Sequence, residues 1–341
     1  MALWLIRAGK GGAHAATALE QGLAGIGWTE LGDLSEVTSR EQLDALYREQ
    51  FPESHAVSIG LGIGQVWAFR SRVQTGDLVA LPIPARSVIA IGKVTGEYQY
   101  RPDLPDDLRH TRRVDWVRPD IPRSAFDQDL LQSFGSLLTI AQIQRNNAEE
   151  RIRAMVEGRT PPATSPQPTG IDTEVPQAEQ APLNLEEYSR DQIQAHISRR
   201  FRGHDLARLV TAILNAQGYT TEMSPPGPDA GVDIIAGQGP MGFDPPRLVV
   251  QVKSSDSPLD VSPLRELQGV LSGFGAQQGL LVSWGGFRSS VHREARRLFF
   301  QIRLWDARDI IDALLADYDR LPDDLRAELP LKRIWTLVLE E

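Results

Sequence analysis

The sequence of 341 residues contains no cysteine. Disulfide bonds, thiolate metal sites and cysteine nucleophiles are therefore excluded. The chain also lacks any apolar run of the roughly 18–20 residues that a bilayer-spanning helix needs. No basic stretch precedes the apolar start at Leu3, as it would in a secretory signal. We therefore expect a cytoplasmic protein without a membrane segment.

An excess of positive charge is missing as well. The formal net charge is −9, whereas a protein that coats nucleic acid usually carries a basic footprint. Residues 1–140 hold 14 Lys and Arg against 17 Asp and Glu, residues 141–195 hold 5 against 9, and residues 196–341 hold 17 against 19. The two long end segments are thus nearly neutral. A local basic face on either is still compatible with DNA binding, because acidic metal ligands would lower a nuclease's total.

Composition divides the chain into four segments. The length predicts two domains of roughly 100–200 residues each. Residues 158–182 hold six prolines and no aromatic residue, which is typical of a disordered, flexible Pro-rich linker. Residues 124–157 carry apolar side chains at helical spacing and are predicted to be a helical connector. The predicted domains are therefore residues 1–123 and 183–341.

The two domains differ in their patterns, and the overall class is predicted to be α/β (α+β). In the first, strands are expected at Leu3–Arg7, Gly64–Arg70, Asp77–Leu81, Val88–Val94 and Val114–Val117, with helices at Ala13–Gln21 and Ser39–Gln50. A small, strongly bent sheet or β-barrel with helices is the economical arrangement. In the second, helices are expected at Gly203–Ala216, Pro263–Phe274, Ser289–Phe299 and Ala307–Tyr318, with strands at Tyr219–Met223, Val232–Ala236, Leu248–Val252, Gly279–Ser283 and Ile302–Trp305. This alternation predicts a mixed-sheet α/β core.

Three polar residues interrupt two of these apolar strands. Asp233 lies in one, and Gln251 and Lys253 lie in the next. Residues two apart in a strand point to the same face, so Gln251 and Lys253 project together. The Gly/Pro-rich connection is typical of a long hairpin, which would bring Asp233 beside them. A carboxylate, an amide oxygen and an ammonium at one sheet edge suit phosphodiester hydrolysis with Mg²⁺.

Several runs surround these residues in a specific order. The segments FRGHDLARLVTAILNAQGY, GPDAGVD, QVK, VSPLRELQG and GLLVSWGGF resemble the Mrr-like restriction endonucleases of the PD-(D/E)-x-K nuclease superfamily. The resemblance implies a nuclease acting on DNA with Mg²⁺ or Mn²⁺, with Asp233 catalytic, Gln251 a metal ligand and Lys253 the catalytic lysine. Without this context, an Asp followed by Gln-x-Lys would usually be solvent-facing strand residues.

One position departs from the family's pattern. Family members commonly carry a Glu in the first helix, where this chain has Ala207. Asp205, close by at the start of that helix, is our candidate for the extra acid, and the alternative is an ordinary helix-start residue. Gln268 in the following helix is a candidate accessory residue or a plain surface glutamine. The departure leaves open a second function, a catalytically weakened sensor that binds nucleic acid.

The amino-terminal half carries looser motifs. WLIRAG, GIGW, GDLVAL and IAIGKVTGEY are similar in layout to PUA-like and EVE-type domains, which read modified bases in an aromatic pocket. The resemblance implies a pocket that includes Trp28 or Trp67, since base capture combines stacking with edge hydrogen bonds. A protein-binding or structural barrel and an RNA-directed reader are the alternatives. Together the two halves predict a modification-dependent restriction endonuclease of anti-phage defence, working as a homodimer.

Overall fold

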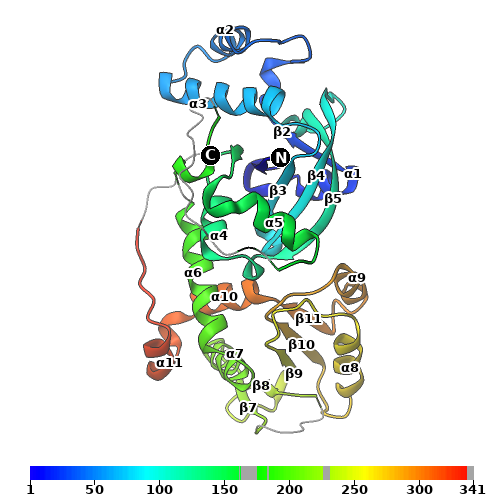
Figure 1. Cartoon of the computed structure of the whole chain (residues 1–341). Helices are drawn as coiled ribbons and strands as arrows, with labels where there is room; N and C mark the ends of the chain where they lie inside the picture. Colours follow the sequence, from blue (N-terminus) through cyan, green and yellow to red (C-terminus); the bar gives the residue numbers. More distant parts are fainter. Residues whose placement is uncertain (161, 163–174, 183, 226–230, 336–341) are drawn as a thin grey trace. The chain divides into compact units, whose positions relative to one another are not determined.

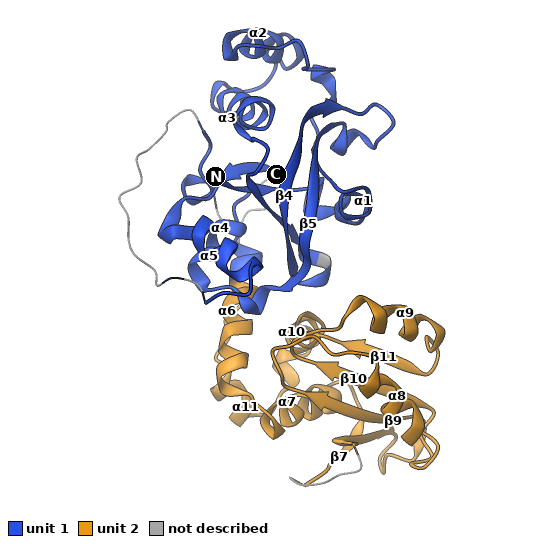
Figure 2. Ribbon diagram, turned by 45° about the vertical axis from the view of Figure 1, so that its right-hand side comes forward, with its two compact units in different colours: residues 1–188, 338–341 blue, residues 189–337 orange. Residues whose placement is uncertain are grey.

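The computed structural model describes residues 1–160, 162, 175–182, 184–225 and 231–335. The chain forms two compact units, of which the first begins at Met1 and the second at Ser189 (Figure 2). Both are mixed α/β structures, which confirms the predicted fold class. Among the described residues, none of the helices combines the length and apolar character that crossing a bilayer requires.

The first unit is built on a six-stranded sheet. Its order is β2-β5-β4-β3-β1-β6, and only β1 and β3 pair in parallel. The strands are β1 (Leu3–Ile6), β2 (Leu23–Ile26), β3 (Leu78–Ile83), β4 (Val88–Tyr100), β5 (His110–Pro122) and β6 (Ile140–Gln142). Within the described residues, the end strands β2 and β6 do not pair with each other. The sheet is therefore open, so the β-barrel, one of the two arrangements expected from the sequence, is wrong.

Five helices accompany this sheet: α1 (Ala15–Gln21), α2 (Arg40–Gln50), α3 (Ala56–Trp67), α4 (Gln128–Phe134) and α5 (Ala148–Val156). Helices α4 and α5 place Phe134 and Ile152 in one core with Leu3 and Leu5 of β1. The alternate residue Trp4 belongs to a second core on the opposite face. The period-2 pattern of β1 thus places a core on each side of the sheet.

The strand expected at Gly64–Arg70 is wrong, because these residues form the end of α3 and the π-helical turn that follows it. Helix α3 buries Ile59, Ile63 and Val66 with residues of α2. A side chain at Gly62 would come within 2.1 Å of the Tyr47 hydroxyl. Gly62 therefore allows α2 and α3 to pack closely. An apolar run of this kind does not by itself distinguish a helix from a strand.

The predicted connector and linker also join the first unit. Residues 140–142 form β6, which pairs antiparallel with β1, so the continuous helical pattern expected across residues 124–157 is wrong. Apolar side chains of that segment lie in the core with β1. At the end of the predicted linker, Gln177 forms a bridge with Gln142, and Val175 and Ala178 are buried. Residues 161 and 163–174 of the linker lie outside the described residues.

The second unit has a five-stranded sheet of order β11-β10-β9-β8-β7 (Figure 1). Strands β9, β10 and β11 are parallel, while β8 and β7 run antiparallel to their neighbours. The strands are β7 (Thr220–Met223), β8 (Ile234–Gln238), β9 (Asp244–Lys253), β10 (Gln278–Ser283) and β11 (Ile302–Trp305). The helices are α6 (Leu185–Arg200), α7 (His204–Ala216), α8 (Ser262–Val270), α9 (Ser289–Arg297), α10 (Ala307–Ala316) and α11 (Asp323–Glu328). All nine elements predicted here from Gly203 onward are confirmed.

Helices cover both faces of this sheet, as expected. Helices α7 and α10 pack on the face that carries Val250 and Val252 of β9. Helices α8 and α9 pack on the opposite face, which carries Val249 of β9 and Leu281 of β10 (Figure 1). Because strand residues alternate between faces, Gln251 and Lys253 belong to the α8 and α9 face.

Candidate active site

Strand pairing brings the three predicted residues together. In the antiparallel pair, Ile234 of β8 lies opposite Val250 of β9, so Asp233, one residue earlier, lies opposite Gln251. The backbone N–H of Asp233 donates to the carbonyl of Val250 (2.9 Å), and the N–H of Val252 donates to Oδ2 of Asp233 (2.7 Å). The Asp233 carboxylate is therefore held at the edge where β9 ends.

Gln251 is the most unusual residue of the group. It is only 2% exposed, yet its Oε1 atom has no hydrogen-bond partner within the described part of the chain. Gly231, with φ +82°, lies next to its amide, and a Cβ there would stand 3.3 Å from Nε2. Buried polar atoms are almost always hydrogen-bonded. The amide oxygen of Gln251 is therefore a buried acceptor that no described residue satisfies.

Two neighbouring segments fix the end of β9. Lys253 is half-buried and lies opposite Ser283 of β10, and its carbonyl accepts from the N–H of Trp284 (2.9 Å). The N–H of Gly203, just before α7, donates to Oγ of Ser254 (2.9 Å). The start of α7 therefore lies beside the end of the strand that carries Lys253.

The structure also places the two less certain candidates. The Asp205 side chain, in the first turn of α7, is 57% exposed and lies 3.7 Å from Nε of Arg208, its only ion pair among the described residues. Ala207 is 2% exposed and belongs to the apolar core under α7. Gln268 is exposed on α8. Contacts of Asp205 or Gln268 with Asp233, Gln251 or Lys253 are not seen in the described ranges.

The donor set of the site suits a hard divalent cation. Carboxylate and amide oxygens are the ligands that Mg²⁺ takes, together with several waters. No group of three or more His, Cys, Asp or Glu side chains arranged for a metal occurs in the described residues. A cation here would therefore rely on Asp233, Gln251 and water. Asp229, which the sequence Pro-Asp-Ala-Gly predicts to be a turn residue, lies outside the described residues.

Comparison with known families agrees with this geometry. Residues 198–314, which include every residue of the candidate site, match the family described as a restriction endonuclease. The second unit contains a restriction endonuclease domain. This confirms the Mrr-like nuclease suspected from the motifs around Asp233 and Lys253, and it supports an endonuclease that acts on DNA.

The other comparisons do not identify a function. Residues 4–143 match a family described as a domain of unknown function, DUF8426. None of the curated proteins matches the sequence. Two solved structures align with the sequence. The DNA modification-dependent restriction endonuclease AspBHI is 15% identical, and the alignment covers 79% of this chain and 72% of that one with a TM-score of 0.34. The MspJI restriction endonuclease in complex with a 27-mer oligonucleotide is 13% identical, and the alignment covers 82% of this chain and 70% of that one with a TM-score of 0.32. At these TM-scores neither alignment establishes a shared fold or function.

The first unit contains a cavity of about 250 Å³ that the motifs WLIRAG and GIGW help to form. Residues of both motifs line it together with residues from distant parts of the unit. The lining residues are Arg7, Gly9, Lys10, Gly27, Trp28, Glu30, Phe51, Asp107, Leu137 and Thr139. Trp28 lines this cavity. Trp67 does not line it and packs beside the core of α2 and α3.

A hydrogen-bonded chain holds Trp28 in place. Trp28 has φ +59°, a left-handed conformation that strains a residue with a side chain. Its indole Nε1 donates to the Tyr47 hydroxyl (3.1 Å), and its carbonyl accepts from Nε2 of buried His110 (3.0 Å). The Tyr98 hydroxyl donates to Nδ1 of His110 (2.7 Å). Burial lowers the pKa of His110 and raises that of Tyr98 to about 12, so both groups are neutral.

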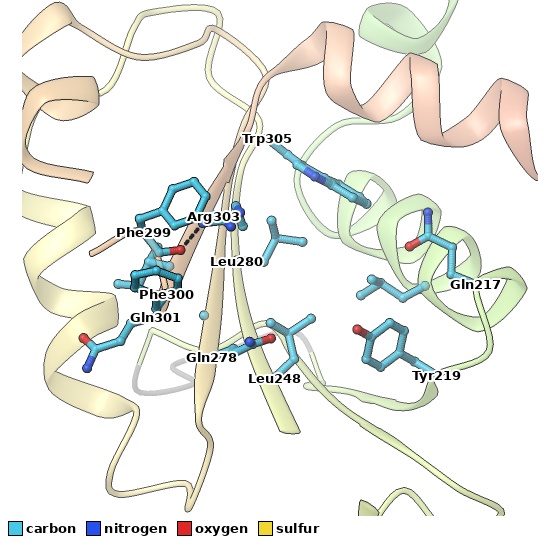
Figure 3. A pocket seen from close by; sticks show the side chains of 13 residues that line it. Gln217, Tyr219, Leu248, Gln278, Leu280, Phe299, Phe300, Gln301, Arg303 and Trp305 are labelled. Atoms are coloured by element: carbon cyan, nitrogen blue, oxygen red, sulfur yellow. Dashed lines mark hydrogen bonds between the residues drawn. The ribbon is translucent and has the colours of Figure 1, made fainter. Parts of the chain in front are cut away.

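Another cavity, of about 270 Å³, lies in the endonuclease domain (Figure 3). Aromatic and amide side chains such as Tyr219, Trp305 and Gln217 line it, together with Leu248 and Leu280. These strand positions lie toward the beginnings of the paired segments of β9 and β10, whereas Lys253 and Ser283 end those strands. The cavity is therefore separate from the candidate active site, and no sequence motif predicted it.

Proposed function

We propose that the protein is a Mg²⁺-dependent restriction endonuclease in which Asp233, Gln251 and Lys253 form the catalytic group. The observation that carries this proposal is the buried Oε1 atom of Gln251, which lacks a partner in the described residues and shares a sheet edge with the Asp233 carboxylate. A buried acceptor of this kind costs stability unless a ligand satisfies it. A divalent cation is the ligand that both oxygens prefer.

Each residue has a distinct role in this proposal. Asp233 and Gln251 would hold Mg²⁺ or Mn²⁺, which supplies polarisation of the phosphate and a water with a lowered pKa. The hydrogen bond from Val252 keeps the Asp233 carboxylate in one orientation. Lys253 projects to the same face, where its ammonium orients the attacking water and offsets charge on the phosphate in the transition state.

We further propose that the first unit reads a modified base and so directs cleavage to foreign DNA, as in anti-phage defence. Its cavity of about 250 Å³ is slightly smaller than the roughly 300–1,000 Å³ of drug-sized sites, which suits a single flipped ring. Trp28 and Phe51 offer faces for stacking, while Glu30 and Asp107 offer acceptors for a base's amino group. The strained backbone of Trp28, held by Tyr47 and His110, is the kind of feature that functional sites retain.

Digestion of paired DNA substrates tests both parts of the proposal. Phage DNA with modified bases and the same DNA without them is incubated with Mg²⁺ and either wild type or Lys253→Ala. Cutting of the modified DNA by wild type alone is the expected result. A wild type that binds DNA and leaves both substrates intact would support the alternative function, a sensor without cleavage.

Binding without divalent metal separates the reader from the nuclease. Stacking on an aromatic side chain contributes about 1–3 kcal/mol per base, so Trp28→Ala should weaken binding of the modified duplex by roughly 5- to 150-fold. Trp116→Ala is the matched control, because this half-buried tryptophan packs beside α1 and does not line the cavity. Equal affinity for modified and plain DNA, unchanged by Trp28→Ala, would remove the reader function. If an RNA competitor displaces the DNA, the first unit would instead be a reader of RNA.

Cleavage of both strands of a duplex needs two active sites, so we propose that two copies act together. We also propose that the protein acts on this DNA in the cytoplasm. Sedimentation of the protein with and without a cleavable duplex tests the stoichiometry, and a single copy bound per double-strand cut would contradict it.

A further inference from the structure

Helix α9 carries positive charge on one side only. Arg288, His292, Arg293, Arg296 and Arg297 are exposed, whereas Val291 is fully buried. Successive residues of an α-helix are about 100° apart, which places His292, Arg293, Arg296 and Arg297 within one half of the helix surface, and Arg288 immediately precedes the helix. The single acid of the helix, Glu294, lies outside that half and faces Arg265 (3.5 Å). We call the five basic residues the α9 surface.

The four arginines of this surface have no carboxylate partner among the described residues. By contrast, three arginines of the α10 to α11 region each face a carboxylate: Arg308 faces Asp312, Arg320 faces Asp317 and Arg326 faces Asp323. The four arginines thus differ from those of the α10 to α11 region, and within the described residues their charge is available to an external anion.

Charge in the domain is separated between the two faces of the sheet. Residues 306–328 hold eight Asp and Glu against three arginines, while residues 288–297 hold four arginines against one Glu. Helix α10 packs on the face that carries Val250, and α9 packs on the other. The near-neutral total of this half therefore conceals a positive side and a negative side.

The α9 surface lies on the same face as the candidate active site. Gln251 and Lys253 alternate with Val250 and Val252, so they project toward the α8 and α9 side. The loops that follow β9 and β10 are joined, because Leu259 donates to the carbonyl of Gly286 (3.0 Å) and accepts from the N–H of Arg288 (3.0 Å). The start of α9 is thereby fixed relative to the strand that ends at Lys253.

We propose that the α9 surface binds the sugar-phosphate backbone of duplex DNA beside the scissile phosphate. The inference rests on the nuclease function proposed above and identifies where its substrate lies. All four formal cations are arginines, whose planar guanidinium groups bind phosphate oxygens in pairs. Arg293 lies three and four residues before Arg296 and Arg297, so these three arginines are neighbours on the helix surface, which suits adjacent phosphates.

The salt dependence of DNA binding tests this surface in the full-length protein. A labelled duplex is titrated without divalent metal between about 50 and 200 mM salt, where each phosphate contact contributes about 0.9 to the slope of log K against log salt. Arg293→Gln, Arg296→Gln and Arg297→Gln together should lower that slope by up to about 2.7. Wild type should then lose up to about 40-fold more affinity than the variant across this range.

Two controls make the result specific. The same three changes at Arg308, Arg320 and Arg326 remove equal charge from the acidic side and should leave the slope unchanged. Lysine in place of the three α9 arginines keeps the charge and should retain most of the slope. Unchanged thermal unfolding of each variant confirms that these exposed side chains are not needed for folding.

The outcomes separate this inference from the proposed function. A glutamine variant of α9 with the slope and affinity of wild type would overturn the inference, as would an equal loss in the acidic-side control. If that variant binds as wild type and wild type still cleaves with Mg²⁺, the nuclease function stands and the α9 surface serves another anion, such as an acidic polypeptide. If binding depends on α9 but wild type never cleaves, the proposed function fails and the binding surface stands.

Discussion

Replacement of Gln251 by leucine should stabilise the metal-free protein while it removes the metal site. The side chain is 2% exposed and its Oε1 has no partner in the described residues. A buried acceptor without a partner costs about 1–3 kcal/mol, and leucine fills similar space without that acceptor. We expect the free energy of unfolding to rise by about 1 kcal/mol, which is a Tm increase of about 2–4 °C for a domain of roughly 150–250 residues, close to the size of the second unit.

The same variant should lose its response to metal. A ligand at 100 times its Kd stabilises the folded state by about 2.7 kcal/mol, so Mg²⁺ should raise the Tm of wild type and leave Gln251→Leu unchanged. Gln278→Leu is the matched control, because this glutamine is exposed at the start of β10 and should alter neither value. Calorimetry of the full-length chain with EDTA and with Mg²⁺ measures both effects.

Two results would refute the reasoning about Gln251. A metal-free Gln251→Leu protein that unfolds more than about 1 kcal/mol more easily would show that the amide has structural partners whose loss is costly. An increase in Tm with Mg²⁺ as large as that of wild type would show that the metal binds elsewhere.

Four further predictions concern single side chains. Lys253→Ala should abolish cleavage and leave thermal unfolding and DNA affinity close to wild type, and an unchanged cleavage rate would contradict the assignment. Burial lowers the pKa of His110 below its usual value of 6.5. As the pH falls, His110 therefore takes up a proton in the unfolded chain before it does so in the folded one. The first unit should therefore lose stability as pH falls below about 6.5. Urea unfolding at several pH values should show less of this loss in His110→Gln. Asp205→Asn should raise the Mg²⁺ concentration for half-maximal cleavage with little change in Tm, and an unchanged Mg²⁺ dependence would make Asp205 a plain helix-start acid. Ala207→Glu should lower the Tm, because it places a carboxylate in an apolar core.

The helices and strands of the endonuclease domain could largely be predicted from the sequence, because their apolar residues recur at helical or strand spacing. Helix α7 buries Leu206, Leu209, Val210 and Ile213 on one side, and its strands are short apolar runs between turns. The alternation of Gln251 and Lys253 with buried valines predicted their shared face. The strand register that places Asp233 opposite Gln251 could not be predicted from the sequence, because a bulge between Ala236 and Gln238 shifts the pairing of β8 with β9.

The first unit was harder to predict for physical reasons. Strands β2 and β6 have four and three residues, too few to show a period, and both gain stability from pairing with distant strands. Helix α3 is apolar on most sides, so its pattern suits a strand equally well. The cavity beside Trp28 combines Lys10, Phe51 and Asp107 from separate elements, and only the folded chain brings them together.

Cleavage by Asp233→Asn with and without Mg²⁺ is the most direct test of the proposed active site. Asparagine keeps an oxygen that can accept from the N–H of Val252, so the strand pairing is preserved while the charge is lost. The account predicts that wild type cuts modified DNA only with a divalent metal, and that Asp233→Asn loses more than the 10- to 100-fold typical of changes beyond the metal ligands. Cleavage by wild type in EDTA, or an Asp233→Asn protein that cuts at the wild-type rate, would contradict it.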